Sequence, residues 1–218
     1  MVRLFPNLPA IRFRGRIHEM VAQSLQENDI GIVPTDVPVY HYGWTRLARS
    51  SGEMAAKRRL YREIHLQEWH RNDDPQSAYY YLISLDDQRE KIRQALQLSG
   101  KYPQYKFFWE QLAMTAANLG EWPRALAYAE RGLARHPENE TLKAVKAAAL
   151  NETGQPLCAL GIIEDLLRTN PDQPLYLVEK FRSLLLARRQ PEALALKDKL
   201  PPDFPEELFR ILDRMGTG

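Results

Sequence analysis

The sequence predicts a mainly α-helical protein, in which helical hairpins stack into a solenoid after a short β-rich N-terminal segment. Three observations lead to this fold class. Landmark residues recur at one fixed interval in the second half of the chain. Apolar residues follow a helical period from about residue 52 onward. Over much of residues 1–44, apolar and polar residues alternate instead, which is typical of strands.

The composition is that of an ordinary globular chain. Of 218 residues, 44% are hydrophobic and 27% are charged, which argues against extensive disorder. The net charge of +2 lacks the basic excess of a nucleic-acid-binding protein. One cysteine excludes an intramolecular disulfide framework and a multi-cysteine zinc site. No apolar stretch approaches the roughly 20 residues of a membrane span. Pro6 and Pro9 oppose a helical transit peptide, so we expect a cytoplasmic protein without a targeting segment.

Residues 1–50 are predicted to be β-rich. Residues 11–17 alternate apolar and polar side chains, which is the period of a half-buried strand, and residues 2–5 would pair with them as a hairpin. A third strand fits residues 37–44. Three short strands form a poor core by themselves. The segment therefore needs another part to pack on, or it is a remnant of a larger domain.

Residues 51–74 are predicted to form a basic linking helix. Ala56, Leu60 and Ile64, with Trp69 adjacent, fall near one face of this helix, and the basic run 57–59 lies largely off it. We interpret that run as a solvated face, with binding of an anionic lipid or nucleic acid as the alternative. Pro75 is expected to close the segment.

Residues 75–218 contain the internal repeat. The landmarks that share one spacing are Gly120 and Gly154; Ala125, Ala159 and Ala193; and Pro137 and Pro171. This spacing equals the length of a tetratricopeptide (TPR) repeat, roughly 34 residues. Trp109 and Leu112 precede Ala125 as they would in such a repeat. The repeated alanine indicates a close helix crossing. The repeated glycine indicates a helix end in the left-handed conformation.

The spacing divides this part of the chain into units. Two full repeats cover residues 106–139 and 140–173, and a partial repeat covers 174–200. A degenerate repeat with a shortened first helix precedes them at 75–105, and a capping helix follows at 204–215. Each helix pair buries its apolar face only by stacking on its neighbours.

Two motifs near the N-terminus resemble a second family. Residues 16–19 (RIHE) and 41–44 (HYGW), followed by the basic helix and the repeats, resemble the C-terminal end of bacterial family 2 glycosyltransferases of GT-A fold. The similar subgroup carries TPR repeats directly after the catalytic domain, so the resemblance covers nearly the whole chain. It implies the C-terminal portion of a hexosyltransferase-like enzyme that transfers a sugar from a nucleotide-sugar donor. It also implies a divalent metal, Mn²⁺ or Mg²⁺, in the complete enzyme.

The resemblance assigns roles to six residues. His18 and Glu19 resemble the catalytic pair on the acceptor side, where a glutamate would take the proton of the acceptor hydroxyl. His41 resembles a metal ligand, although one histidine cannot build a metal site by itself. The residues that would bind substrate are Arg16, Tyr42 and Trp44.

The residues also have structural interpretations that stay open. His18 and Glu19 would be a solvent-exposed strand end, or Glu19 would form an ion pair with Arg14 or Arg16. His41 would be a hydrogen-bonded core histidine, and Tyr42 and Trp44 would be core aromatics. The single Cys158 is interpreted as a small buried apolar residue.

The nucleotide-binding half of a GT-A enzyme, with its Asp-x-Asp metal motif, is missing from the sequence. An apolar run that ends at Asp86 and Asp87 could imitate that motif. We favour helices there, because Pro75 and Pro103 bracket the stretch as they would bracket a shortened repeat. We therefore expect no cofactor in this chain and no sugar transfer by this chain alone.

Two functions follow from these patterns. The chain is either the C-terminal portion of a family 2 glycosyltransferase, with a separately encoded GT-A half as its partner, or a stand-alone TPR scaffold. The scaffold would bind a protein partner in its groove. The expected inward positions are Glu110, Met114, Ala144 and Ala148, which lack the lysine and asparagine of a clamp for a C-terminal carboxylate. The groove is therefore expected to be mixed and fairly apolar.

Overall fold

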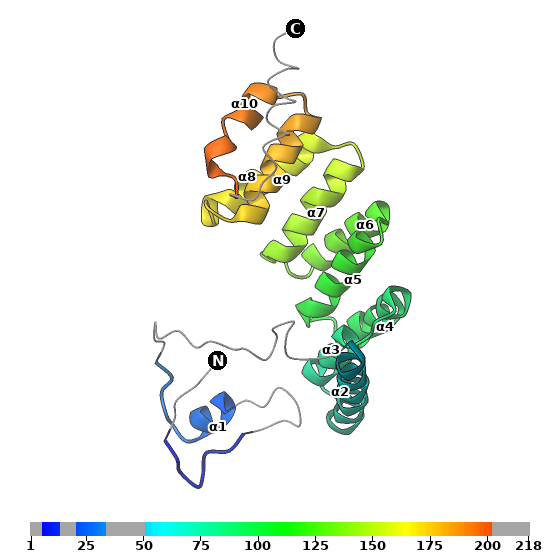
Figure 1. Cartoon of the computed structure of the whole chain (residues 1–218), viewed down its shortest axis with the longest axis vertical. Helices are drawn as coiled ribbons and strands as arrows, with labels where there is room; N and C mark the ends of the chain where they lie inside the picture. Colours follow the sequence, from blue (N-terminus) through cyan, green and yellow to red (C-terminus); the bar gives the residue numbers. More distant parts are fainter. Residues whose placement is uncertain (1–5, 14–20, 34–50, 202–218) are drawn as a thin grey trace. The chain divides into compact units, whose positions relative to one another are not determined.

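The computed structural model describes residues 6–13, 21–33 and 51–201 (Figure 1). The chain divides into two compact units, residues 1–84 and 85–218. The described part of the first unit contains α1 (Ala22–Glu27), α2 (Ser51–Asn72) and α3 (Pro75–Ile83).

The described residues of the N-terminal segment contain a helix and no strand, so the predicted β-rich segment is not supported there. Residues 11–13 lack regular structure, and Phe13 is 57% exposed, although the alternation over residues 11–17 puts it on the same side of the predicted strand as the buried Ile11. The predicted strand 2–5, most of the strand 11–17 and the strand 37–44 lie outside the described residues.

Side-chain hydrogen bonds explain why this stretch differs from a strand. The Ser24 hydroxyl of α1 accepts a hydrogen bond from the Arg12 amide (2.9 Å) and donates one to the Ala10 carbonyl (3.2 Å). These backbone groups are therefore satisfied without a partner strand. Ile11 packs with Leu25 of α1 in a small buried cluster. Ile11 is therefore buried by a helix, and a strand is not supported over the described residues 11–13.

Helix α2 packs on α3 through aromatic rings. His65 is 6% exposed and stacks on Tyr80, with ring centroids 5.5 Å apart. Trp69 stacks on Tyr81, with ring centroids 5.6 Å apart. The two helices therefore pack together through aromatic side chains on the C-terminal half of α2.

The aliphatic stripe predicted for α2 is wrong in its first half. Leu60 is 53% exposed and Ala56 is exposed, whereas Ile64 is half-buried. The reason is length, because α2 has 22 residues and α3 has only 9. The described α3 therefore covers only part of its neighbour. Arg58 and Arg59 are exposed, in agreement with a solvated basic face.

Pro75 begins a helix as well as ending one. It is the first residue of α3, where its missing amide hydrogen is not needed. The Asp74 carboxylate caps this helix by accepting a hydrogen bond from the Ser77 amide (3.0 Å). Asp87 caps the next helix in the same way, through the amides of Arg89 (2.8 Å) and Glu90 (3.0 Å). The helical interpretation of this stretch is confirmed, and the Asp-x-Asp alternative is wrong.

The second unit is a series of packed helices (Figure 1). They are α4 (Gln88–Lys101), α5 (Lys106–Asn118), α6 (Trp122–Leu133), α7 (Glu140–Glu152), α8 (Pro156–Thr169), α9 (Pro174–Leu186) and α10 (Gln190–Leu194), followed by a short 3-10 helix (Lys197–Lys199). Each helix packs on the next, and α7 also packs on α5 and α9. The result is a helical solenoid. The predicted capping helix 204–215 lies outside the described residues.

The repeated residues occupy the positions that their chemistry predicts. Ala125, Ala159 and Ala193 each have 0% exposure, in agreement with close helix crossings. Gly120 and Gly154 adopt φ values of +72° and +79° after the first helix of each pair. The amide of the residue that follows each glycine bonds back to a helix carbonyl, as in Glu121 N to Ala116 O at 2.9 Å.

Candidate functional site

The first helices of the three hairpins, α5, α7 and α9, form one continuous face. We call it the first-helix face and define it by nine residues, which lie one helical turn apart along each helix and one repeat length apart between helices. They are Glu110, Met114 and Asn118 of α5; Ala144, Ala148 and Glu152 of α7; and Val178, Arg182 and Leu186 of α9. All nine are exposed or half-buried. Residues one turn apart lie on the same side of a helix, so the nine positions form a regular grid.

Ion pairs distinguish this face from the opposite side of the same helices. Lys146 of α7 pairs with Glu130 of α6 (Nζ–Oε1, 3.0 Å). Lys180 of α9 pairs with Glu164 of α8 (Nζ–Oε1, 3.1 Å). Both lysines reach the second helices, and the two pairs are related by the repeat spacing. Polar contacts on the first-helix face instead join one first helix to the next.

The contact between α5 and α7 uses a neutral partner. Asn139 is 8% exposed and caps α7 by accepting a hydrogen bond from the Leu142 amide (3.0 Å). Its amide group also donates to Glu110 Oε1 at 2.7 Å. The Glu110 carboxylate is thus held in place without the Asn139 contact neutralising its charge.

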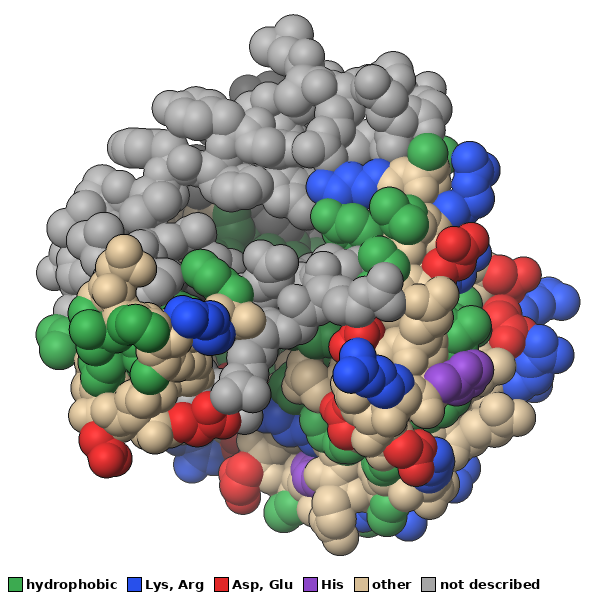
Figure 2. Space-filling model, turned by 90° about the horizontal axis from the view of Figure 1, so that it is seen from below, with side chains coloured by type: hydrophobic (Ala, Val, Ile, Leu, Met, Phe, Trp, Pro, Cys, Tyr) green, Lys and Arg blue, Asp and Glu red, His purple; other side chains and the backbone are tan. Residues whose placement is uncertain are grey.

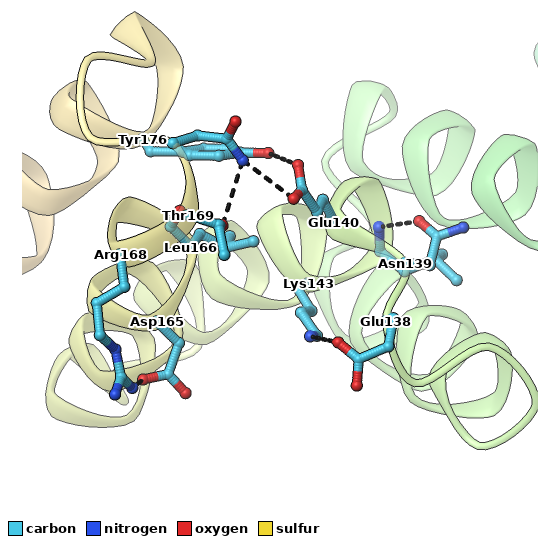
Figure 3. Close-up of polar contacts among 11 residues, drawn as sticks. Glu138, Asn139, Glu140, Lys143, Asp165, Leu166, Arg168, Thr169 and Tyr176 are labelled. Atoms are coloured by element: carbon cyan, nitrogen blue, oxygen red, sulfur yellow. Dashed lines mark hydrogen bonds and ion pairs between the residues drawn. The ribbon is translucent and has the colours of Figure 1, made fainter.

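The starts of α7 and α9 are joined by Glu140 (Figure 3). One oxygen of this carboxylate accepts from the Asn170 side chain (3.0 Å), and the other accepts from the Tyr176 hydroxyl (3.3 Å). The Tyr176 residue is 6% exposed. Burial of this phenol, together with the nearby Glu140 carboxylate, raises the pKa of Tyr176 above its ordinary value.

The ends of α7 and α9 carry the densest polar network of the face. Asn151 is 4% exposed and donates to Glu179 Oε2 (3.0 Å) and to the Ser183 hydroxyl (2.9 Å). Arg182 pairs with Glu152 and also with Glu179 (Nη1–Oε1, 3.5 Å). These bonds fix the spacing of the two helices, because each partner is ordered by another.

The centre of the face is apolar. Met114 is 39% exposed, and Leu186 at one end is 50% exposed. Ala144 and Ala148 are half-buried and present only methyl groups. Positions 110, 114, 144 and 148, which the sequence predicted to face inward, carry no lysine or asparagine. The arrangement therefore differs from a clamp for a C-terminal carboxylate.

The six residues that the glycosyltransferase resemblance singled out all lie outside the described residues. They are Arg16, His18, Glu19, His41, Tyr42 and Trp44. Over residues 6–13, 21–33 and 51–201, no group of three or more His, Cys, Asp and Glu side chains is placed to hold a metal ion.

Cys158 is exposed, so its predicted burial is wrong. It lies in the first turn of α8, where the neighbouring Ala159 takes the core position at 0% exposure. Successive residues point about 100° apart on a helix, which turns the thiol outward. The side chain borders an open pocket of about 340 Å³ with Leu157 and Leu186.

The polar network around Asn151 was missed by the sequence analysis. Polar residues within an apolar helical pattern were its only signal, and pairing partners in the next hairpin cannot be read from such a pattern. The two ion pairs of Lys146 with Glu130 and of Lys180 with Glu164 had a usable signal in the sequence. Both the lysines and the glutamates are separated by one repeat length. Figure 2 shows cationic and anionic side chains interspersed over the coloured surface.

The described helices of the second unit define a TPR-type helical repeat fold. The structure of "MamA MSR-1 C2" is similar with a TM-score of 0.55 and 15% identity, over 76% of this chain and 92% of that chain. The TPR protein TTC0263 of Thermus thermophilus is similar with a TM-score of 0.54 and 16% identity, over 74% of this chain and 92% of that chain. MamA (41-end) of Desulfovibrio magneticus RS-1 gives a TM-score of 0.50 and 18% identity, over 66% and 73%.

These similarities show the fold alone, and they give no support to the glycosyltransferase resemblance. No protein-family model matches the sequence, and no curated protein matches it. Among the described helices, none combines the length and apolar character needed to cross a membrane.

Proposed function

We propose that this chain is a TPR scaffold that binds a protein partner through the first-helix face. The observation that carries the proposal is the arrangement of the nine face residues. Met114 remains accessible beside the half-buried Ala144 and Ala148, between polar contacts that fix α5, α7 and α9 against one another. Such apolar surface is stabilised when a partner covers it.

The first helices are held rigidly against one another, and this rigidity favours partner binding. The hydrogen bonds of Asn139 and Asn151 hold consecutive first helices before any partner arrives. A partner therefore loses less free energy to ordering of the receptor surface. Repeat proteins also present extended surfaces of this kind, because each hairpin adds one row of accessible residues.

The proposal can be tested by selection of ligands. The whole chain is immobilised, and binding peptides are selected from a random library of short peptides. The affinity of the selected peptides is then measured on Ala148→Trp, which fills the centre of the face. The matched control is Ala127→Trp on α6, where the alanine is exposed on a second helix.

We expect Ala148→Trp to weaken binding by at least about tenfold, since apolar contact area at the centre of an interface dominates affinity. Ala127→Trp should leave the affinity unchanged. Thermal unfolding of both variants establishes that each is folded. Equal affinities for the two folded variants would refute the first-helix face as the binding site.

We propose as a second function that the chain is the C-terminal portion of a family 2 glycosyltransferase. The motifs at residues 16–19 and 41–44 support this proposal. Glu19, with His18, would serve as the acceptor-side base, and His41 would be one ligand of the divalent metal of a complete enzyme. Arg16, Tyr42 and Trp44 would contact substrate. The partner would be a GT-A half encoded separately or upstream, and the location would be cytoplasmic.

The expected result for this polypeptide by itself is no sugar transfer. A leaving diphosphate needs a positive centre. The sequence offers only Asp86 and Asp87, at the end of an apolar run, in place of an Asp-x-Asp metal motif, and Asp87 caps helix α4 instead. The chain is titrated with nucleotide sugars and Mn²⁺ by calorimetry. Saturable donor binding without an added GT-A half would contradict this expectation. Activity that depends on both the added half and Glu19 would support the second function.

A further inference from the structure

Among the residues that the structure describes, carboxylates outnumber cations on and beside the first-helix face. Glu110 is held by the neutral Asn139 amide at 2.7 Å. At the other end, Glu152 and Glu179 share the single guanidinium of Arg182. The local balance is therefore three carboxylates against one cation.

The lysines of α7 and α9 do not offset this excess, because each is engaged elsewhere. Lys146 and Lys180 pair with glutamates on the second helices. Lys143 pairs with Glu138 in the preceding loop (2.9 Å). Lys106 belongs to α5 and borders the face; its ammonium group lies 5.2 Å from the centre of the Phe107 ring, a contact that leaves its positive charge in place. With Lys106 counted, three carboxylates stand against two cations among these residues. The residual charge beside the apolar centre of the face is therefore negative.

Cationic side chains of a partner bind most favourably to carboxylates that are already held in place, because less ordering is then needed on binding. The Glu110 carboxylate is positioned by a capped helix start, and the Glu152 carboxylate is positioned by Arg182. Both lie one helical turn from a small or apolar face residue, Met114 in α5 and Ala148 in α7. A bound segment would thus meet carboxylates on either side of an apolar centre.

We propose that the partner of the first-helix face is an extended peptide segment that carries lysine or arginine beside apolar side chains. The proposal rests on the binding function proposed above and adds the chemistry of the ligand. Electrostatic complementarity of this kind selects the partner and speeds association more than it adds affinity. It also predicts that binding weakens as salt is added.

The test uses the peptides selected on the whole chain. We expect them to be enriched in lysine and arginine and to bind more weakly at high salt. The double variant Glu110→Gln with Glu152→Gln removes two carboxylates from the face with almost no change in shape. We expect it to weaken binding of the basic peptides by about tenfold. The matched control is Glu130→Gln with Glu164→Gln, which changes the net charge equally but on the second helices.

The outcomes separate this proposal from the proposed function. Selected peptides that are neutral or acidic, yet lose affinity on Ala148→Trp, would overturn the basic ligand and leave the binding face standing. Basic peptides that bind both double variants equally would also overturn it, because they would respond to overall charge. Peptides unaffected by Ala148→Trp would overturn the binding face itself. Failure to select any peptide would count against both.

Discussion

At the scale of single residues, Gly132 has the tightest surroundings of the described glycines. A Cβ atom at this position of α6 would lie 2.6 Å from Leu142 Cδ1 and 2.9 Å from Trp109 Cβ. The side chains that it meets belong to α5 and α7, so this glycine allows three helices to meet. No larger residue fits without displacing one of them.

We expect Gly132→Ala to lower the free energy of unfolding by about 1–3 kcal/mol, the usual cost of overpacking a core. Urea denaturation measures the change. The matched control is Gly161→Ala in α8, where an added Cβ meets no atom within 4 Å. That substitution should instead stabilise the protein by about 0.8–1 kcal/mol through helix propensity. Destabilisation of equal size by both substitutions would contradict the packing around Gly132.

Arg188 stands where the two preceding hairpins have glycine. Its φ of +60° matches the left-handed conformation of Gly120 and Gly154, and the three residues share the repeat spacing. The Arg189 amide bonds to the Leu184 carbonyl at 2.8 Å, so the helix ends with the same kind of hydrogen bond. A side chain with a Cβ atom costs about 1–2 kcal/mol in this conformation.

Replacing Arg188 by glycine should therefore raise the midpoint of thermal unfolding. The expected gain is at most about 1 kcal/mol, because glycine also has more freedom in the unfolded chain. Gly154→Ala, the converse change at the equivalent position, should lower the midpoint. A lower midpoint for Arg188→Gly would show that the arginine side chain contributes more than its backbone strain.

At the scale of the helix pair, Tyr176 joins the beginnings of α7 and α9. Its raised pKa means that the folded protein holds the phenol proton more tightly than the unfolded chain. This contribution to stability is complete below the ordinary tyrosine pKa of about 10. It is lost as pH rises through the raised value of the folded state.

We therefore expect the free energy of unfolding to fall more steeply with pH in the alkaline range for the native sequence than for Tyr176→Phe. Chemical denaturation at a series of alkaline pH values gives the two slopes. Tyr128→Phe on α6 controls for the loss of a phenol elsewhere in the solenoid. Parallel slopes for the native sequence and Tyr176→Phe would refute the role of Glu140 and burial in holding this proton.

At the scale of the whole molecule, the division into two units has consequences for folding. The boundary between them falls after Ser84, within the stretch 75–105 that was predicted as one degenerate repeat. In the first unit α3 packs on α2, and in the second α4 packs on α5. Contacts within the second unit run mainly between sequence neighbours, as in repeat proteins whose stability is a sum of nearest-neighbour terms.

We expect a polypeptide of residues 85–218 to fold without the first unit. Circular dichroism should show a helical protein with a cooperative thermal transition. Phe181→Ala in that polypeptide should unfold the α9 region first, because this side chain is 3% exposed in the C-terminal cluster. Hydrogen exchange locates the loss of protection. A helical spectrum that melts without cooperativity would show that the second unit depends on residues 1–84.

Local chemistry explains which parts of the structure were predictable. Ala125 and Ala159 lie in the core, and Gly120 takes the left-handed conformation, because packing and backbone sterics restrict these positions to few residue types. Leu60 was placed in a core that α3 is too short to provide, and Cys158 was placed inside although Ala159 fills that position. Apolar character shows that a residue can be buried, but it does not show which neighbour buries it.

The sequence by itself determined the helical repeat, its period and the absence of a carboxylate clamp, since these depend on residue type and spacing along one chain. Only the tertiary structure decided that α1 occupies residues 22–27, that Asn151 bonds to Glu179 and Ser183, and that Lys146 turns away from the first-helix face. Those features depend on which side chains meet across helices that are well separated along the chain. Periodicity gives the direction of a side chain on its own helix, and the partner at the other end of the contact is set by packing.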